Sequence, residues 1–263
     1  MSMQAVDENL NFLILKLSEE RKEKLDRDVF TFPFAKRFNI ARAYMNLRPA
    51  KSLSEEVVKA QNLVLSSLIK ERGIVDIFNL SEKEKGISLF QGDITRLNAD
   101  VIVNAANSAA QGCFIPGHNC IDNVIHTFAG MQLRLYCHDL IKKRNKELFT
   151  GEAIITPGFN LPARYVIHTV GPIIFVDVNN KKKEELRSCY LNSMNLALEN
   201  KCKSIVFPCI STGEFHFPQK EAAIIAVDCV REFLKAHDYP FKVVFNVFKD
   251  SDLSIYIELL GTQ

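Results

Sequence analysis

Two cysteines and a histidine stand close together in the segment GCFIPGHNCIDN, at Cys113, His118 and Cys120. Thiolate sulfur and imidazole nitrogen are ligands that suit zinc, so this segment is a candidate zinc site. The alternative is chance clustering, because a single cysteine is most often a small buried apolar residue. Three protein ligands leave a fourth position open, as in catalytic zinc sites. A closed structural site is a second interpretation, and its fourth ligand would be Asp122, His126 or His216.

Further polar groups surround this segment, which follows the strand-like run VIVN (101–104). Asn104 and Asn107 are three residues apart and offer amide donors and acceptors to a polyhydroxylated ligand. Gly112 and Gly117 allow the backbone to approach such a ligand closely. Asp122 opens a helical run whose N-terminus favours an anion, and an acid in a first helical turn also interacts favourably with the helix dipole. The segment therefore combines metal-binding and ligand-binding chemistry.

Two other loops carry residues that suit a nucleotide-like ligand. In QGDIT (91–95), Asp93 follows a strand and can accept a hydrogen bond from an exocyclic amine such as that of adenine, although a plain Gly-Asp turn is the alternative. In ISTGEFHFP (210–218), Ser211, Thr212 and Gly213 supply hydroxyl and backbone N–H donors before a helix, which suits phosphate oxygens. The spacing differs from GxxxxGK[ST], so a nucleoside triphosphatase P-loop is excluded.

The elements that must position these loops alternate between strand and helix from residue 85 onward. Helices are predicted over 120–145, 181–201, 218–236 and 251–260. Strands are predicted over 87–90, 101–104, 153–156, 165–170, 204–209 and 242–248. Such alternation indicates an α/β domain with helices on both faces of its sheet. Ligands of such sheets bind beyond the carboxyl ends of the strands.

The first 84 residues have a different texture and are predicted to be helical. Asp7 is the predicted cap of a helix carrying Leu10, Leu13, Ile14 and Leu17, and Pro33 opens a second helix that ends before Pro49. Ser52 and Glu55 form a capping box for a third helix that ends at Gly73. We therefore divide the chain into an N-terminal helical extension (1–84) and an α/β domain (85–263). A structural cap without chemistry is the expected role of the extension.

Composition excludes several classes of protein. The 263 residues are 47% hydrophobic and 24% charged, which is too apolar for a disordered chain. A net charge of +2 argues against a dedicated polyanion binder, and the run KKK (181–183) is expected to be a solvated loop, so nucleic acid is not an expected partner. No run approaches the roughly 18 apolar residues of a membrane span, and the start lacks a secretory signal. Seven cysteines, an odd number, indicate reduced thiols or metal ligands in a cytoplasmic protein, expected to be a monomer.

Taken together, QGDIT, VIVN leading into NAAN, GEAIITPGFNLPARYVIHTVGP (151–172) and CISTGEF (209–215) resemble the macrodomain family. The resemblance spans about residues 85–260 and implies a three-layer α/β/α fold with a mixed central sheet that binds ADP-ribose. It implies that Asp93, with Ile94 beside it, contacts adenine, and that Asn104 and Asn107 lie near the distal ribose. The diphosphate would be wrapped by Ser211, Thr212, Gly213, Glu214 and Phe215. Phe248 matches an aromatic residue that stacks on adenine, whereas composition alone would place it in the core.

The pattern departs from common macrodomains where a glycine-rich run is replaced by the cysteine- and histidine-bearing segment. Together with the N-terminal extension, this departure resembles a zinc-dependent branch of the family. The implied function is hydrolysis of mono-ADP-ribose from modified proteins at the distal ribose, with Asn107 and Asp122 as catalytic residues and Zn²⁺, held by Cys113, His118 and Cys120, orienting the substrate. For Asp122, helix capping is the alternative role. A non-catalytic ADP-ribose reader and a hydrolase of O-acetyl-ADP-ribose are the alternative functions.

Overall fold

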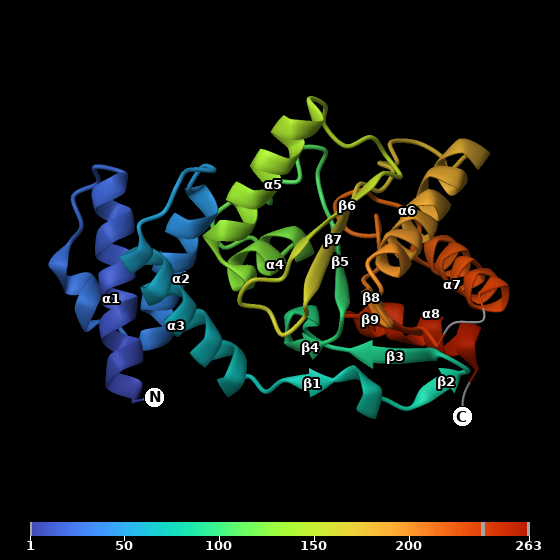
Figure 1. Cartoon of the computed structure of the whole chain (residues 1–263), viewed down its shortest axis with the longest axis horizontal. Helices are drawn as coiled ribbons and strands as arrows, with labels where there is room; N and C mark the ends of the chain where they lie inside the picture. Colours follow the sequence, from blue (N-terminus) through green and yellow to red (C-terminus); the bar gives the residue numbers. More distant parts are fainter. Residues whose placement is uncertain (1, 238–239, 262–263) are drawn as a thin grey trace.

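A mixed sheet lies at the centre of the computed structural model, which describes residues 2–237 and 240–261 (Figure 1). Within these residues its strand order is β2-β3-β9-β8-β5-β7-β6. The strands are β2 (Glu82–Glu84), β3 (Ile87–Gln91), β9 (Lys242–Val247), β8 (Ser204–Phe207), β5 (Val101–Ala105), β7 (Tyr165–Thr169) and β6 (Ala153–Pro157). Only the two edge pairs, β2 with β3 and β6 with β7, are antiparallel. The six predicted strands are confirmed.

Helices cover both faces of this sheet, as predicted. One face packs on α4 (Ile121–Ala129) and α5 (Met131–Arg144), and the other on α6 (Asn180–Glu199), α7 (Gln219–Ala236) and α8 (Asp250–Leu260). The strand period of two divides the core accordingly, since Ile102 of β5 joins the first cluster while Val101 and Val103 join the second. The predicted three-layer α/β/α architecture with a mixed central sheet is therefore confirmed. None of the described helices is long and apolar enough to cross a membrane.

The N-terminal extension folds as three helices, α1 (Met3–Glu20), α2 (Phe34–Leu47) and α3 (Glu55–Glu71), which lie beside α4 and α5 in Figure 1. Leu10, Leu13 and Ile14 are fully buried against α2 and α3, as the helical spacing predicted. The predicted caps were wrong by a few residues. Ser2 caps α1, because its hydroxyl accepts the Ala5 N–H, and Asp7 instead binds Arg37. Ser54 caps α3, while the Ser52 carbonyl accepts a hydrogen bond from Arg48.

The predicted helix over 120–145 is interrupted. It ends at Ala129 and restarts at Met131, because Gly130 has a φ of +98° that disrupts helical geometry. A Cβ at Gly130 would lie 2.5 Å from Nε2 of Gln61 in α3, so a side chain would also clash with the extension. The break lets α4 and α5 run in different directions beside the extension (Figure 1).

Short strands near the predicted boundary were missed. β1 (Val75–Asp76) pairs with β4 (Leu97–Asn98), and β2 lies at the sheet edge beside β3. These runs of two or three residues are mostly polar and show no strand periodicity. Residues 75–84 thus join strands of the α/β domain, and the division at residue 84 stays a prediction.

Candidate functional site

The polar loops singled out in the sequence meet along one edge of the sheet. Strands β3, β9, β8 and β5 are parallel neighbours, so their carboxyl ends lie side by side. These ends lead, in that order, to Asp93, to Phe248, to the loop 211–215 and to Asn104 and Asn107. The order along the edge is therefore adenine, diphosphate and distal ribose, if each group has the contact that the resemblance implies.

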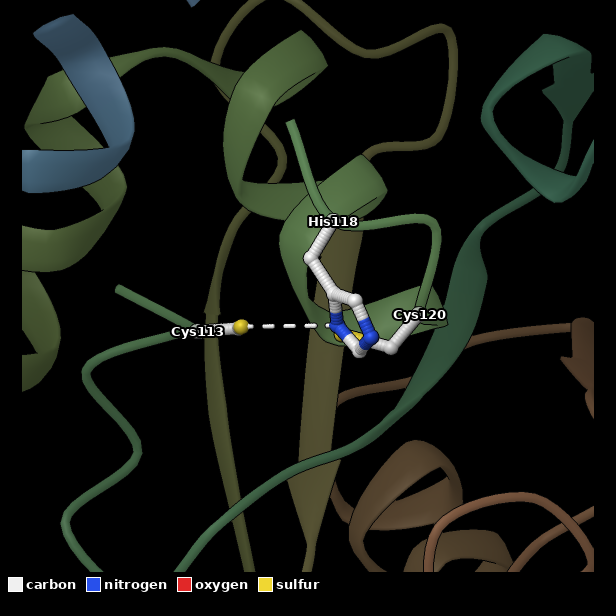
Figure 2. Close-up of side chains that lie close together, drawn as sticks. All are labelled: Cys113, His118 and Cys120. Atoms are coloured by element: carbon white, nitrogen blue, oxygen red, sulfur yellow. Dashed lines mark hydrogen bonds between the residues drawn. The ribbon is translucent and has the colours of Figure 1, made fainter. Parts of the chain in front are cut away.

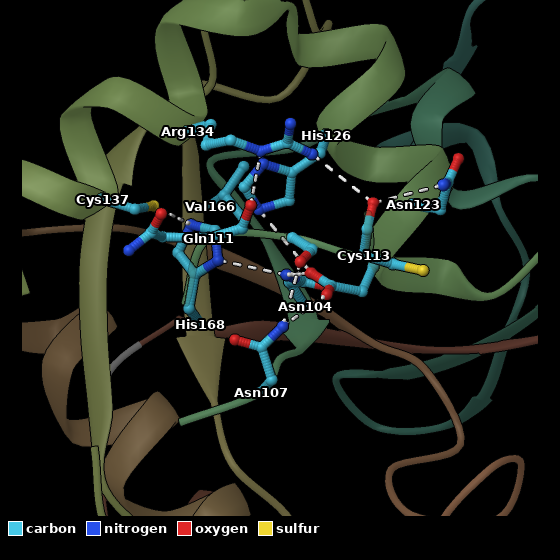
Figure 3. A network of polar contacts seen from close by, with 12 residues as sticks. Asn104, Asn107, Gln111, Cys113, Asn123, His126, Arg134, Cys137, Val166 and His168 are labelled. Atoms are coloured by element: carbon cyan, nitrogen blue, oxygen red, sulfur yellow. Dashed lines mark hydrogen bonds and ion pairs between the residues drawn. The ribbon is translucent and has the colours of Figure 1, made fainter. Parts of the chain in front are cut away.

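Asn104 and Asp122 form the polar centre of the β5 end, and Figure 3 shows Asn104 beside His168. Asn104 is fully buried, and its Nδ2 donates to Oδ1 of Asp122 at 2.7 Å and to Nδ1 of His168 at 3.1 Å. Both amide hydrogens of Asn104 are therefore used within the protein, and one of them orients the Asp122 carboxylate. Asp122 itself is 6% exposed.

Burial raises the pKa of Asp122 to about 6, although the hydrogen bond from Asn104 and the charge of Arg134 act in the opposite direction. A carboxyl group with such a pKa exchanges its proton near neutral pH, which is what general acid–base chemistry requires. Asp122 also lies in the first turn of α4, as predicted. Its position thus serves the helix dipole and the site together.

Asn107 lies on the other side of the Asp122 carboxylate. Its Nδ2 donates to the Gly112 carbonyl at 3.1 Å and to Oδ2 of Asp122 at 3.4 Å. Its Oδ1 is buried and has no hydrogen-bond partner within the described protein. A buried amide oxygen without a partner carries a desolvation cost that a hydroxyl group of a ligand would remove.

The structure brings Cys113, His118 and Cys120 together just beyond Asn107 in the chain (Figure 2). Their sulfur and nitrogen atoms all lie within 4.8 Å of one another, and Sγ of Cys113 is 3.6 Å from Nδ1 of His118. Tetrahedral zinc with its usual bond lengths places such ligand atoms about 3.5–3.8 Å apart. The donor types and the spacing both fit zinc.

The thiol of Cys120 is held at the start of α4. Its Sγ accepts the backbone N–H of Asn123 at 3.4 Å and caps the helix. Burial raises its pKa to about 12; that N–H lowers the pKa, whereas Cys113 and Asp122 raise it.

The proposed fourth ligands of a closed site do not join this group. Among the described residues, those that bring their ligand atoms together at this place are Cys113, His118 and Cys120. His216 is exposed, and the Asp122 carboxylate faces Asn104, Asn107 and His126. On the far side of the His118 ring, Nε2 lies 3.7 Å from Oε1 of Glu214. A carboxylate on the second nitrogen of a metal-binding histidine orients its ring.

The loop 211–215 can bring backbone and hydroxyl groups close to a ligand. Ser211 has a φ of +66°, and its hydroxyl is buried with no hydrogen-bond partner within the described protein. Thr212 is tied to its own turn by a bond from its hydroxyl to the Cys209 carbonyl at 3.0 Å, and Gly213 and Glu214 are exposed. Phe215 is half-buried, and its carbonyl accepts the Ile174 N–H at 2.9 Å.

At the β3 end, Asp93 begins a short 3-10 turn. Its Oδ1 accepts the N–H and the hydroxyl of Thr95, and its Oδ2 accepts a bond from Arg72. Ile94 is 4% exposed, so its side chain is buried and not open to a ligand. Phe248, which follows the adjacent strand β9, is 76% exposed and is not a core residue. Its ring is free to stack, in line with the expected role.

Several arginines and asparagines that support the site were missed. Arg42, Asn46 and Arg72 come from the extension and contact the loop 112–120 or Asp93. Arg134 of α5 is buried and donates to the carbonyls of Gln111 and Cys113. Arg134 follows Leu133 on the side of α5 that faces the core. This position in the sequence could have indicated a buried arginine with a structural role.

A second group of potential ligands, His126, Cys137 and His168, lies buried beneath Asp122. Both nitrogens of His168 are already engaged, by Asn104 and by the Thr156 hydroxyl at 3.1 Å. Burial, then the neighbouring His168 and the charge of Arg134, lower the pKa of His126 well below its usual value, so positive charge is already near this group. These contacts fit a neutral structural cluster better than a metal site.

A family model described as "Macro domain" matches residues 103–226, which include the β5 end, the loop 112–120 and the loop 211–215. The chain belongs to the Macro domain family, since a curated protein is also similar along nearly its whole length. That protein, from Staphylococcus aureus (strain MRSA252), is named Protein-ADP-ribose hydrolase and is 43% identical over 97% of this chain and 97% of its own length.

Two solved structures are similar to the α/β domain. An Oceanobacillus iheyensis macrodomain with ADP has a TM-score of 0.62 and 38% identity over 69% of this chain and 93% of that chain. A Trypanosoma brucei macrodomain in complex with ADP-ribose has a TM-score of 0.66 and 29% identity over 83% of this chain and 95% of that chain. The S. aureus protein and the T. brucei structure each cover more of this chain than the α/β domain, so both also match part of the extension.

Proposed function

We propose that this protein is a zinc-dependent hydrolase that removes mono-ADP-ribose from modified proteins. The observation that carries the proposal is the order of groups along the sheet edge, which ends in Asn107, Asp122 and a three-ligand group suited to zinc. The name of the S. aureus relative and the ligands of the two solved macrodomains support the same substrate class.

The proposed ligand would lie across the carboxyl ends of four strands. Asp93 would accept the adenine amine while Phe248 stacks on the ring. The backbone of residues 211–215 and the Ser211 hydroxyl would bind the diphosphate, which needs no basic surface. The distal ribose would then meet Asn107 and Asp122, because these follow the last strand of the series, β5.

Hydrolysis requires water to add at the anomeric carbon while the bond to the modified side chain breaks. Asp122 would hold that water and take its proton, since its raised pKa suits a general base near neutral pH. Asn104 would keep the carboxylate in place, and Asn107 would bind a ribose hydroxyl through its unpartnered Oδ1. Cys113, His118 and Cys120 would hold zinc, which when bound supplies a Lewis acid that orients the distal ribose. Glu214 would fix the His118 ring.

The decisive experiment measures zinc content and time-resolved ADP-ribose release from a mono-ADP-ribosylated protein. Wild type should contain about one zinc per chain and release ADP-ribose, whereas Cys120→Ala should lose both properties. Cys202→Ala is the matched control, because Cys202 is buried beside β8 and outside the metal-binding group. Equal release by a zinc-free Cys120→Ala variant would refute zinc dependence.

The same assay separates the alternative functions. A reader module would bind ADP-ribose but release none from Asp/Glu-, Ser- or Arg-linked substrates. Turnover of O-acetyl-ADP-ribose alone would indicate the small-ester hydrolase. We further propose that the protein acts as a monomer in the cytoplasm without a nucleic acid partner. All seven cysteines are free thiols, as expected in a reducing compartment.

A further inference from the structure

The loop 112–120, which carries the three proposed zinc ligands and is called the metal-binding loop below, is hydrogen-bonded to the N-terminal extension. We propose that Arg42 and Asn46 of α2 are positioning residues that hold Cys113, His118 and Cys120 in ligand geometry. The extension is then part of the site and not only a structural cap. The part of this inference that concerns zinc affinity rests on the proposed function, whereas the part that concerns loop order does not.

Arg42 contacts the loop at His118, the proposed histidine ligand. Its Nη2 donates to the backbone carbonyl of His118 at 2.7 Å and to Oδ1 of Asn123 at 2.9 Å. One guanidinium group thus ties the histidine ligand to the first turn of α4. Because a hydrogen bond to a charged donor is stronger than a neutral one, this contact restricts the position of His118.

Asn123 extends this contact to both cysteines. It is fully buried, and its backbone N–H donates to Sγ of Cys120. Its Nδ2 donates to the carbonyls of Ile115 at 2.9 Å and Cys113 at 3.4 Å. Arg42 therefore reaches all three ligand positions, directly at His118 and through Asn123 at the two cysteines.

Asn46 holds the loop one residue before His118. Its Oδ1 accepts the Gly117 N–H at 2.9 Å, and its Nδ2 donates to the Thr127 hydroxyl of α4 at 3.1 Å. Asn46 is 2% exposed, so this bond is shielded from water. Gly117 has a φ of +65°, and the fixed amide holds this left-handed turn.

Arg134 of the α/β domain is hydrogen-bonded both to the end of α2 and to the loop. Its Nη1 donates to the carbonyls of Met45, Asn46 and Arg48 at the end of α2, and its Nη2 donates to the Cys113 carbonyl. The guanidinium group also lies 4.1 Å from the centre of the Phe114 ring. The end of α2 and the start of the loop are thus bound to one buried cation.

The loop needs these partners because it has little internal structure. Residues 112–120 contain no helix or strand, and His118 N–H to Ile115 O is the backbone bond recorded within this described segment. A loop without such support would sample many conformations and would pay the ordering cost when a metal binds. Groups that hold metal ligands in place typically contribute 10- to 100-fold to metal affinity.

The test combines hydrogen–deuterium exchange of the full-length protein with zinc competition against a chromogenic chelator. Asn46→Ala should accelerate exchange in peptides covering residues 112–120 by about tenfold or more and weaken zinc binding by about 10- to 100-fold. Peptides of β5 and β8 should keep wild-type protection. Asn46→Asp keeps the acceptor for the Gly117 N–H and should restore loop protection. Asn39→Ala is the matched control, because Asn39 is exposed on the same helix.

Wild-type loop exchange in Asn46→Ala would overturn the inference, as would failure of Asn46→Asp to restore protection. Arg42→Met provides a second variant if Asn46→Ala does not fold, since Arg42 is only half-buried and Met keeps its aliphatic packing. It should show the same loop exchange and the same loss of zinc affinity. If the wild-type chain binds no zinc, the proposed function fails, and the exchange measurements still decide whether the extension orders the loop.

Discussion

Nη1 of Arg72 lies 2.6 Å from Oδ2 of Asp93, so the residue that directly follows the extension's third helix holds the carboxylate expected to meet adenine. Arg72 also donates to the Thr95 hydroxyl at 3.0 Å and lies 3.7 Å above the Phe128 ring. Burial lowers the pKa of Arg72, and Asp93 raises it again, as expected of a charged pair that is partly removed from water. The extension therefore contacts both ends of the proposed ligand site.

Replacing Arg72 by Ala should weaken ADP-ribose binding by about tenfold, because a charge-assisted bond to a carboxylate contributes about 1.5–3 kcal/mol and solvent replaces part of it. The loss should raise KM with little change in kcat, since Asp93 lies at the opposite end of the site from Asp122. Titration calorimetry and initial rates measure the two effects. Lys70→Ala, an exposed change on the same helix, should leave both unchanged. An Arg72→Ala variant with wild-type affinity would show that Asp93 orients itself.

Asp122→Asn should lower the rate of ADP-ribose release about 100-fold or more, as expected for the loss of a general base. Binding of ADP-ribose should change only a few fold, because Asn can still accept the bond from Asn104. Single-turnover release and calorimetry on the same preparation separate the two properties. The control is Asp139→Asn, an exposed change on α5. Release at the wild-type rate would restrict Asp122 to the capping role.

Two glycines of the loop 112–120 should respond differently to replacement by alanine. A Cβ at Gly112, where φ is +80°, would lie 2.7 Å from Cγ of the buried His126 ring. At Gly117, where φ is +65°, no heavy atom lies within 4 Å of the added Cβ. Gly117→Ala should therefore cost only the left-handed backbone penalty, about 1 kcal/mol. Gly112→Ala should lower the free energy of unfolding by roughly a further 1–3 kcal/mol, because the added Cβ overpacks the His126 ring.

Urea denaturation of both variants measures this difference, and their zinc content shows whether the loop keeps its geometry. Gly112→Ala should lose zinc while Gly117→Ala retains it. Equal stabilities of the two variants would contradict the close packing of Gly112 on His126.

The buried His168 should make the protein less stable in acid. Burial lowers its pKa to about 3, and His126 beside it has a pKa lowered well below the usual value, first by burial. In the unfolded chain a histidine takes up a proton near pH 6.5, whereas the folded protein keeps His168 neutral. The stabilisation is therefore present above about pH 6.5 and is lost as the pH falls toward 3.

Between pH 6 and 4, His168 alone should lower the free energy of unfolding by about 1.4 kcal/mol per pH unit. Asp122 acts in the opposite direction, since its pKa is raised in the folded state. His168→Gln isolates the contribution, because Gln can accept from Asn104 and donate to Thr156 without titrating. Its urea midpoint should fall less steeply with pH than that of wild type. Parallel curves would mean that His168 is protonated in the folded protein.

Much of the site was predictable because its signals are local. Cys113, His118 and Cys120 lie within eight positions on one loop, so the chain itself keeps them near one another. The loops after β3, β8 and β5 were predicted to converge because parallel strands place their carboxyl ends on one edge. The predicted helix over 120–145 failed where Gly130 reverses the sign of φ, a property that apolar periodicity does not report.

The sequence by itself determined the kind of fold, the sheet edge at which the site lies, and the donor types offered to a metal, because periodicity and residue chemistry are local properties. Only the tertiary structure decided that Asn104 faces Asp122 and His168, and that Arg42 reaches His118 across 76 positions. Such contacts depend on how α2 and α3 pack on α4, and side-chain direction after packing leaves no periodic signal in the chain. The extension, expected to be a structural cap, thereby lies in contact with the site.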